Sequence, residues 1–355
     1  MLPIPESRRQ AIREGASDRA THAQWLQELG LDAALDVGES AARPAPPSRA
    51  LRVIAWNLER CQQLEASTAL LEAHAPDVLL LGEMDWGMAR TGNRHTAREL
   101  AARLGCAYAF GVEFLELDLG GASERALWAG RTNAVGYHGN AILARGELLR
   151  PRLVRLERRG DWFDGARGER RVGGRCAVLA QIVLAGRPVT FAAVHLESHG
   201  TREERALEMQ ALLDAIDDYA PGAPALIGGD LNCFSLELAA MGDPRAVAEA
   251  LRGDPGRWSH PVPHEPLFER AARAGYEWSS CNALGVPTLR HASPGGASRL
   301  GSARGALKLD WLLCRGLAAA APCVIEAVGG DGRMLSDHEA IAAEVAPLGC
   351  SGEPQ

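Results

Sequence analysis

Residues 225–232 read Ala225-Leu226-Ile227-Gly228-Gly229-Asp230-Leu231-Asn232, an apolar run that breaks at two glycines and ends in a carboxylate and an amide. In an extended chain, residues two apart point to the same side, so Asp230 and Asn232 face one site. The glycines have no Cβ and let a substrate or another strand approach the backbone. Such a pair suits the binding of a metal, a water or a phosphate oxygen, although a strand entering an Asx-type turn explains the same residues.

Polar side chains follow five other strand-like runs. They are Asn57 after residues 53–56, Glu83 after residues 78–82, His195 after residues 191–194, Asp310 after residues 307–309, and the pair Asp337-His338 after residues 335–336. One such ending is common, but six together predict strand ends that converge on one polar cleft. Enzymes built on sheets bind their ligands at such places.

These side chains are carboxylates, amides and imidazoles, and none is a cysteine. Hard oxygen ligands with few nitrogens favour Mg²⁺ or Mn²⁺ over zinc. The sequence contains neither a G-x-S-x-G nucleophile elbow nor a Walker A loop. It therefore predicts that a metal- or base-activated water attacks a phosphoryl group.

The chain has 355 residues, 46% of them hydrophobic, and we expect one large domain with a small appendage. Its formal net charge of −7 argues mildly against a non-specific nuclease, although a local basic groove would suffice for DNA.

The lack of an apolar signal region or membrane-spanning run predicts a cytoplasmic protein. The eight cysteines show no C-x-x-C spacing, so we expect reduced, buried thiols rather than a zinc site or disulfide framework.

The hydrophobic pattern predicts two short N-terminal helices, at residues 7–14 and 22–31, before a Pro-rich linker. This segment is a lid, a dimerisation arm or a strap packed on the core, and the sequence does not choose among them. Strands are expected at residues 51–58, 77–83, 108–117, 134–143, 148–156, 176–184, 189–196, 307–314 and 339–345, and helices at residues 61–74, 96–104, 201–219 and 265–274. Buried strands interleaved with helices indicate sheets packed under helices.

Seven short segments resemble, in order, the motifs of the endonuclease/exonuclease/phosphatase superfamily. They are Ala55-Trp56-Asn57, Leu81-Gly82-Glu83, Gly139-Asn140-Ala141-Ile142-Leu143, Val194-His195-Leu196-Glu197-Ser198, Gly229-Asp230-Leu231-Asn232, Leu309-Asp310-Trp311 and Ser336-Asp337-His338. The resemblance implies the DNase-I-like α/β fold, a four-layer α/β/β/α sandwich of two mixed β-sheets packed face to face and flanked by helices. We expect this domain at residues 49–347, after an N-terminal helical extension and Pro-rich linker at residues 1–48 and before a C-terminal tail at residues 348–355.

The resemblance also implies a metal site and a water-activating group. Glu83 resembles the principal Mg²⁺ ligand, and Asn57 and Asp337 would assist it or hold the water of the metal. Asp230 resembles the carboxylate that orients or deprotonates the attacking water. Asn232 would hold a phosphate oxygen or Asp230 itself. Which group is the actual base stays open.

Two histidines are implied to face the phosphate. His338 resembles the histidine beside the scissile phosphate, and Asp310 its carboxylate partner, which fixes tautomer and charge. His195 resembles a second phosphate-facing histidine, a general acid in some members. Asn140 is a candidate phosphate contact on the Gly139 segment.

Each of these residues also has a purely structural interpretation. Asn57 and Glu83 can cap strand ends or form surface ion pairs. His195, taken alone, reads as a satisfied core histidine, and Asp310 can pair with Lys308. The combined set favours the active-site interpretation.

Substrate specificity is less defined. The segment after Glu83 predicts a loop at the rim of the cleft, where Arg94 would grip an anionic substrate, with solvated arginines at a helix start as the alternative. Arginines are dense from residue 145 to residue 175, and Arg170 among them is a candidate substrate contact. With little aromatic interleaving, a solvated edge with ion pairs fits this run better than a nucleic-acid groove.

The sequence as a whole predicts a Mg²⁺-dependent phosphoesterase, with Mn²⁺ as an alternative ion. The expected substrate is a phosphorylated small molecule or lipid head group, and no specific protein partner is inferred. A DNA or RNA nuclease of the same fold is the alternative within this class. A non-catalytic binding module is the alternative from another class.

Overall fold

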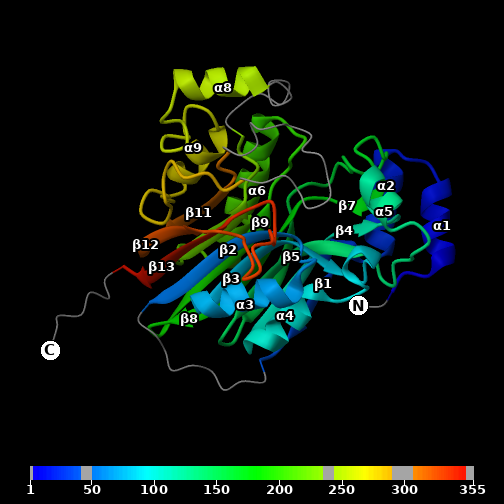
Figure 1. The fold of residues 1–355 in the computed structure, drawn as a ribbon, viewed down its shortest axis with the longest axis horizontal. Coiled ribbons are helices and arrows are strands. Elements are labelled where there is room, and N and C mark those ends of the chain that lie inside the picture. The colour runs from blue at the N-terminus through cyan, green and yellow to red at the C-terminus, as the bar shows by residue number, and fades with distance from the viewer. Residues whose placement is uncertain (1–2, 41–49, 235–243, 290–306, 349–355) are drawn as a thin grey trace.

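Two mixed β-sheets pack face to face, and helices cover their outer faces (Figure 1). The computed structural model describes residues 3–40, 50–234, 244–289 and 307–348. The predicted linker at residues 41–48 and the tail after residue 348 lie outside the described residues. No helix in the described part of the chain is long and apolar enough to cross a membrane.

The first sheet has the strand order β1-β4-β5-β3-β2-β13-β12, with β7 also paired to β4. Its strands are β1 (Leu35–Gly38), β2 (Leu51–Arg60), β3 (Val78–Trp86), β4 (Ala107–Glu116), β5 (Tyr137–Ala144), β7 (Arg171–Gly173), β12 (Leu317–Ile325) and β13 (Ala340–Pro347). Strands β2 and β3 run parallel, so their carboxyl ends lie at the same edge of the sheet.

The second sheet has the order β11-β10-β9-β8-β6. Its strands are β6 (Leu149–Arg155), β8 (Cys176–Leu184), β9 (Arg187–His195), β10 (Ala225–Asp230) and β11 (Asp310–Arg315). The register pairs Asp230 with His195 on one side and with Asp310 on the other. Three predicted site residues thus lie side by side across three neighbouring strands.

The helices are α1 (Glu6–Glu14), α2 (Arg19–Glu28), α3 (Leu64–His74), α4 (Thr96–Leu104), α5 (Ala122–Leu127), α6 (Arg202–Tyr219), α8 (Pro244–Gly253) and α9 (Pro266–Arg273). Apolar residues of α3 and α4 pack on the first sheet, and those of α6 and α9 pack on the second. A third apolar cluster, which includes Leu80 and Leu226, fills the space between the sheets. These three layers of buried side chains confirm the predicted four-layer α/β/β/α sandwich.

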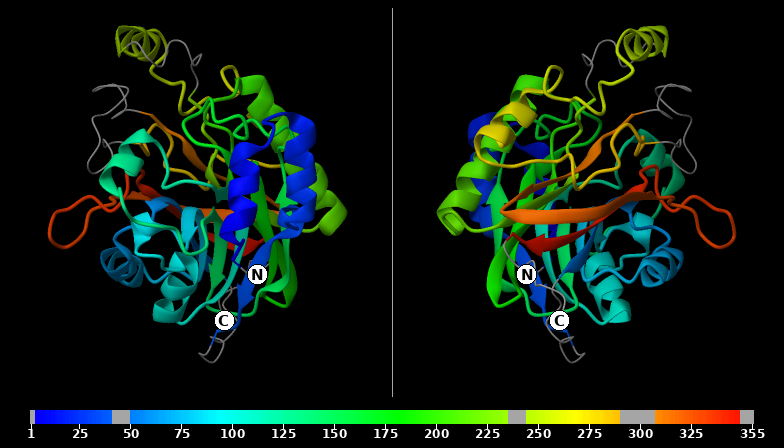
Figure 2. Two further views of the ribbon diagram at one scale, coloured as in Figure 1. Left: turned by 90° about the vertical axis from the view of Figure 1, so that its right-hand side faces the viewer. Right: turned by 90° about the vertical axis from the view of Figure 1, so that its left-hand side faces the viewer.

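The N-terminal segment packs on the sandwich, as expected for the strap among the alternatives left by the sequence. Helices α1 and α2 lie side by side (Figure 2) and are joined by the ion pair of Arg8 with Glu28 at 3.4 Å. The buried Arg9 side chain donates to the carbonyl oxygens of Val135 and Glu116. After α2, strand β1 pairs antiparallel with β4 and so extends the first sheet.

The arginine-dense segment is only partly a solvated edge. Arg155 is buried and donates to the carbonyl oxygens of Leu31, Val112, Glu113 and Gly174. Arg175 is also buried and pairs with Glu113 at 2.6 Å and with Glu197 at 3.1 Å. These two cations therefore hold strands together, a role that the charge pattern does not reveal.

Candidate active site

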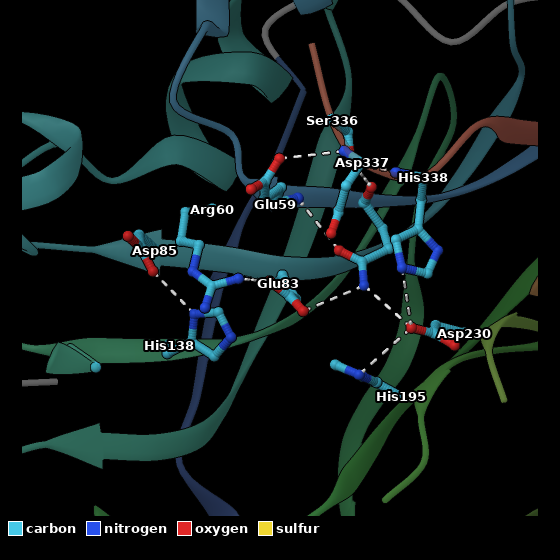
Figure 3. Close-up of polar contacts among 12 residues, drawn as sticks. Glu59, Arg60, Glu83, Asp85, His138, His195, Asp230, Ser336, Asp337 and His338 are labelled. Carbon is cyan, nitrogen blue, oxygen red and sulfur yellow. Dashed lines mark hydrogen bonds and ion pairs between the residues drawn. The ribbon is translucent and has the colours of Figure 1, made fainter. Parts of the chain in front are cut away.

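The site forms where the carboxyl ends of the two parallel strand pairs meet. Strands β2 and β3 bring Asn57 and Glu83, and strands β9 and β10 bring His195 and Asp230. Figure 3 shows Glu83 near Asp230, with His195 and His338 approaching Asp230 from different sides. The predicted side chains therefore come together, but the prediction that each ends a strand is only partly right. His195 and Asp230 end their strands, whereas Asn57 and Glu83 lie inside theirs. Asp310 begins β11, and Asp337 and His338 precede β13.

Asn57 links the two sheets. Its Nδ2 donates to Oε1 of Glu83 at 3.2 Å and to Oδ2 of Asp230 at 3.1 Å. Its Oδ1 accepts from the backbone N–H of Glu59 at 3.1 Å, which fixes the orientation of the amide. One buried asparagine thus sets the position of the two carboxylates relative to each other.

Glu83 lies at a bulge rather than at the end of its strand. The β3 register shifts on both sides around this residue, and its φ of 55° is left-handed. A bulge redirects a side chain, here towards Asn57 and Arg60. Burial disfavours the Glu83 carboxylate, but the Arg60 guanidinium on its Oε2 outweighs burial and lowers the pKa of Glu83 well below its usual range.

Arg60 belongs to a left-handed turn that the sequence did not reveal as part of the site. Glu59, Arg60 and Cys61 have φ values of 44°, 70° and 54°. Non-glycine residues adopt this conformation at a cost, which the surrounding contacts must offset. The turn directs Arg60 to Glu83, while Oε2 of Glu59 accepts from the backbone N–H of Asp337 at 3.1 Å.

Asp230 is the centre of the cluster. Its Oδ2 lies 3.6 Å from Nε2 of His195 and 3.6 Å from Nε2 of His338. Its Oδ1 accepts from the backbone N–H of Asn232 at 2.8 Å. The side chain of Asn232 donates instead to the carbonyl of Leu196 at 2.8 Å, so in this structure the backbone of Asn232 holds Asp230.

The two glycines before Asp230 are required by close packing. A Cβ on Gly229, whose φ is 145°, would lie 2.0 Å from the carbonyl oxygen of Val194. A Cβ on Gly228 would lie 2.7 Å from side chains of both sheets, Leu80 and Leu312. The glycines therefore allow the sheets and strands to approach, rather than a substrate.

His338 and Asp310 form a buried pair, with Nδ1 of His338 2.8 Å from Oδ2 of Asp310. Burial lowers the pKa of His338, but the Asp310 and Asp230 carboxylates raise it well above its usual value. Lys308 does not compete for this carboxylate, because its Nζ donates to the backbone oxygen of Asp310 at 3.3 Å.

The pKa values of His195 and His338 shift in opposite directions. Burial and the nearby Arg175 charge lower the pKa of His195 to about 3, against the opposing attraction of Asp230. The surroundings therefore favour the neutral imidazole at His195 and the imidazolium at His338.

The segment Ser336-Asp337-His338 is tied to the end of β2. Oγ of Ser336 donates to the carbonyl of Asn57 at 2.6 Å and accepts from the backbone N–H of His338 at 3.1 Å. Asp337 is half-buried, and burial raises its pKa. Glu83 is also half-buried, whereas Asn57 and Asp230 are buried.

His138 and Asp85 lie beside Glu83 (Figure 3). Nδ1 of His138 is 2.8 Å from Oδ1 of Asp85. Arg90 donates one hydrogen bond to each oxygen of the same carboxylate, both at 2.8 Å. Arg90 is buried and additionally pairs with Glu116 at 2.7 Å. Arg90 comes from the segment after Glu83, which the sequence predicts as a loop at the rim of the cleft, but in the structure it is a buried structural cation.

Three other candidate residues have partners outside the cluster. Nδ2 of Asn140 donates to Glu113 at 3.2 Å and to the carbonyl of Cys176 at 2.9 Å. Arg94 pairs with Glu65 at 2.9 Å and with Glu99 at 2.8 Å. Arg170 donates to backbone oxygens of Arg13, Gly15 and Ala16 at the end of α1 and just after it. The structure thus does not place Arg94 or Arg170 against the converging strand ends.

A model of the endonuclease/exonuclease/phosphatase family matches residues 54–338, which include every residue of the cluster. The chain belongs to the endonuclease/exonuclease/phosphatase family. Members of this family hydrolyse phosphate esters and generally use a divalent metal ion. The half-buried carboxylates of Glu83 and Asp337 are oxygen donors of the kind that such an ion prefers.

Solved structures of this family share the fold of the chain. An endonuclease/exonuclease/phosphatase from Beutenbergia cavernae is 18% identical over 84% of this chain and 72% of its own, with a TM-score of 0.52. One from Bacteroides vulgatus is 13% identical over 84% of this chain and 100% of its own, with a TM-score of 0.55. The human Nocturnin catalytic domain with bound sulfate is 17% identical over 89% of this chain and 97% of its own, with a TM-score of 0.53. At these identities the likeness shows the DNase-I-like fold alone, and no curated protein sequence matched the chain.

Proposed function

We propose that this protein is a Mg²⁺-dependent phosphoesterase that hydrolyses a phosphate ester by water attack at phosphorus. The observation that carries the proposal is the Asn57 amide, which joins Glu83 to Asp230, with Nε2 of His195 and of His338 each 3.6 Å from Oδ2 of Asp230. This arrangement provides a cation site, a water-orienting carboxylate and two N–H donors within one cluster.

Glu83 and Asp337 would hold the Mg²⁺, or Mn²⁺ in its place, and Asn57 would position the Glu83 carboxylate through its Nδ2. The ligand atoms of Asp230, Asp310 and His338 also lie within 4.8 Å of one another. Nδ1 of His338 is already engaged with Asp310 at 2.8 Å, so we favour the Glu83 group for the cation. A divalent ion held there would supply neutralisation of the negative charge that develops on the phosphoryl oxygens.

The remaining steps belong to the side chains around Asp230. The Asp230 carboxylate orients the attacking water and accepts its proton as the new P–O bond forms. The His338 imidazolium contacts a phosphoryl oxygen and is the group able to donate a proton to the leaving oxygen as the ester bond breaks. Neutral His195 offers an N–H donor without adding charge, and Asp310 holds the tautomer of His338.

A small phosphorylated molecule or a lipid head group is the substrate class that we favour. The chain carries a net charge of −7, and two arginines of the arginine-dense segment, Arg155 and Arg175, are used in internal contacts. A nucleic-acid groove needs accessible cations along a track, together with aromatic side chains for stacking.

The test is a screen of phosphomonoesters, phospholipids, nucleotides and nucleic acids with the metal-stripped protein before and after Mg²⁺ or Mn²⁺ is added. We expect hydrolysis that requires the ion and is absent in Asp230→Asn, while the matched surface variant Arg94→Gln retains full activity. Unchanged turnover in EDTA or in Asp230→Asn would contradict the proposal. Turnover confined to DNA or RNA would retain the mechanism and replace the substrate class with that of a nuclease.

A further inference from the structure

A second cluster of ligand-type side chains lies at the outer edge of the second sheet. The segment after α9 runs along β11, where Glu277 and Cys314 exchange backbone hydrogen bonds of 2.9 and 2.8 Å. Donor atoms of Glu277, Cys281 and Cys314 all lie within 4.8 Å of one another. Two segments more than thirty residues apart in the sequence thus bring two thiols and a carboxylate to one point.

This cluster is separate from the candidate active site. Cys314 is paired with Leu226 near the start of β10, whereas Asp310 is paired with Asp230 at the end of β10. The two sites therefore occupy opposite ends of the same strand pair, and a ligand at one does not contact the other.

The backbone around the cluster is fixed. Both Cys281 and Cys314 are fully buried, with exposed fractions of 0% and 1%. Asn282 donates to the carbonyl of Leu312 at 2.7 Å and accepts from its N–H at 3.1 Å, so the side chain of Asn282 continues the pairing of the edge strand. Ligands held by such a framework lose little further conformational freedom on binding.

Within the part of the chain that the structure describes, the Glu277 carboxylate accepts hydrogen bonds only from neutral groups. The donors are Oγ of Ser279 at 3.0 Å, the backbone N–H of Ser280 at 3.1 Å, Oγ of Ser280, and Sγ of Cys314 at 2.8 Å. Among the described residues, no lysine, arginine or histidine forms an ion pair with Glu277. The Glu277 carboxylate has no cationic partner there and lies beside two thiols. One carboxylate and two thiolates are a ligand set that suits a divalent cation such as zinc, which accepts both sulfur and oxygen ligands.

We propose that Glu277, Cys281 and Cys314 form a zinc site with one open position. Three protein ligands leave a fourth tetrahedral position, which a water would take. Glu277 also lines an open cavity of about 550 Å³ together with His260 and Tyr276. On binding, each thiol forms a bond to zinc and releases its proton to solvent, so the hydrogen bond from Cys314 to Glu277 is replaced by coordination. The ion ties residues 277–281 to β11 and therefore stabilises the edge strand that begins at Asp310.

The test uses the full chain, stripped of metal under reducing conditions and titrated with Co²⁺ and then Zn²⁺. We expect about one equivalent of Co²⁺ to produce the absorption of thiolate-to-cobalt charge transfer, which Zn²⁺ then abolishes. Cys281→Ser and Cys314→Ser should each lose this absorption. Glu277→Gln, which retains both thiols, should weaken Zn²⁺ binding by about tenfold or more.

The controls separate this site from misfolding and from the candidate active site. Cys106→Ser alters another buried thiol and should leave the cobalt absorption intact. Asp230→Asn should also leave it intact, because that residue lies at the other end of β10. Circular dichroism of each variant identifies any that does not fold.

Three results would overturn the zinc site. The first is a wild-type protein without charge-transfer absorption at any Co²⁺ concentration. The second is absorption that survives in folded Cys281→Ser and Cys314→Ser. The third is a disulfide between these two cysteines in the protein isolated without reductant, found as two missing thiols on titration of the unfolded chain.

Discussion

Nδ1 of His338 lies 2.8 Å from Oδ2 of Asp310, and both side chains are buried. The other oxygen of Asp310 has no hydrogen-bond partner among the described residues, so the carboxylate acts mainly on this ring. The pair fixes the tautomer of His338 and keeps its proton, since Asp310 and Asp230 overcome the effect of burial on its pKa.

Asp310→Asn should therefore lower kcat by about 100-fold or more while changing KM little, because the amide keeps the shape but not the charge that holds the proton of His338. Steady-state kinetics on the substrate found by screening measures this split. The matched control is Asp331→Asn, which changes an exposed residue in the loop that precedes His338. A parallel loss in both variants, or a change confined to KM, would contradict the assigned role of Asp310.

Arg60→Gln should raise the affinity for Mg²⁺, on the order of tenfold, because the Arg60 guanidinium occupies Oε2 of Glu83 and repels a cation there. Calorimetric titration of the metal-stripped protein measures this affinity without relying on turnover. Arg60→Lys keeps the charge and should bind Mg²⁺ as the wild type does. Weaker binding by Arg60→Gln would mean that Arg60 positions Glu83 for the ion instead of opposing it.

Glu208→Gln should stabilise the protein at pH 8 and much less at pH 5. Burial raises the pKa of Glu208 to about 8, while the unfolded chain ionises near 4.5, so wild-type stability falls as pH rises between these values. The glutamine keeps an acceptor for the backbone N–H of Glu197, now 2.9 Å from Oε2. Urea unfolding of both proteins at the two pH values measures the difference, and a gain that is equal at both would contradict the buried neutral acid.

Arg155→Met should destabilise the fold by about 3–5 kcal/mol, because four backbone oxygens lose a buried charged donor. The control is Arg152→Met on the same strand, where the side chain is exposed and little change is expected. Denaturant midpoints provide the comparison. Equal stability of the two variants would restore the interpretation of this segment as a solvated edge.

Local patterns predicted much of the secondary structure. The helix α4 and the strand β8 have the bounds that periodicity indicated, and Thr201 caps α6 as part of a capping box with Glu204. The strands β1, β7 and β12 were not predicted. The first two are four and three residues long, and β12 is rich in alanine, so their pairing partners rather than their own composition make them strands.

The sequence by itself determined the order of the polar strand ends, and hence the family and the chemistry of the cluster, because buried strands and their terminal residues follow from local hydrophobicity. The tertiary structure alone decided which side chains meet. Asn57 donates to Asp230 from one sheet to the other, and a left-handed backbone turn directs Arg60 to Glu83. Cys281 and Cys314 lie close together although they are far apart in the sequence. Such contacts depend on register, bulges and burial, which long-range packing sets and no local pattern records.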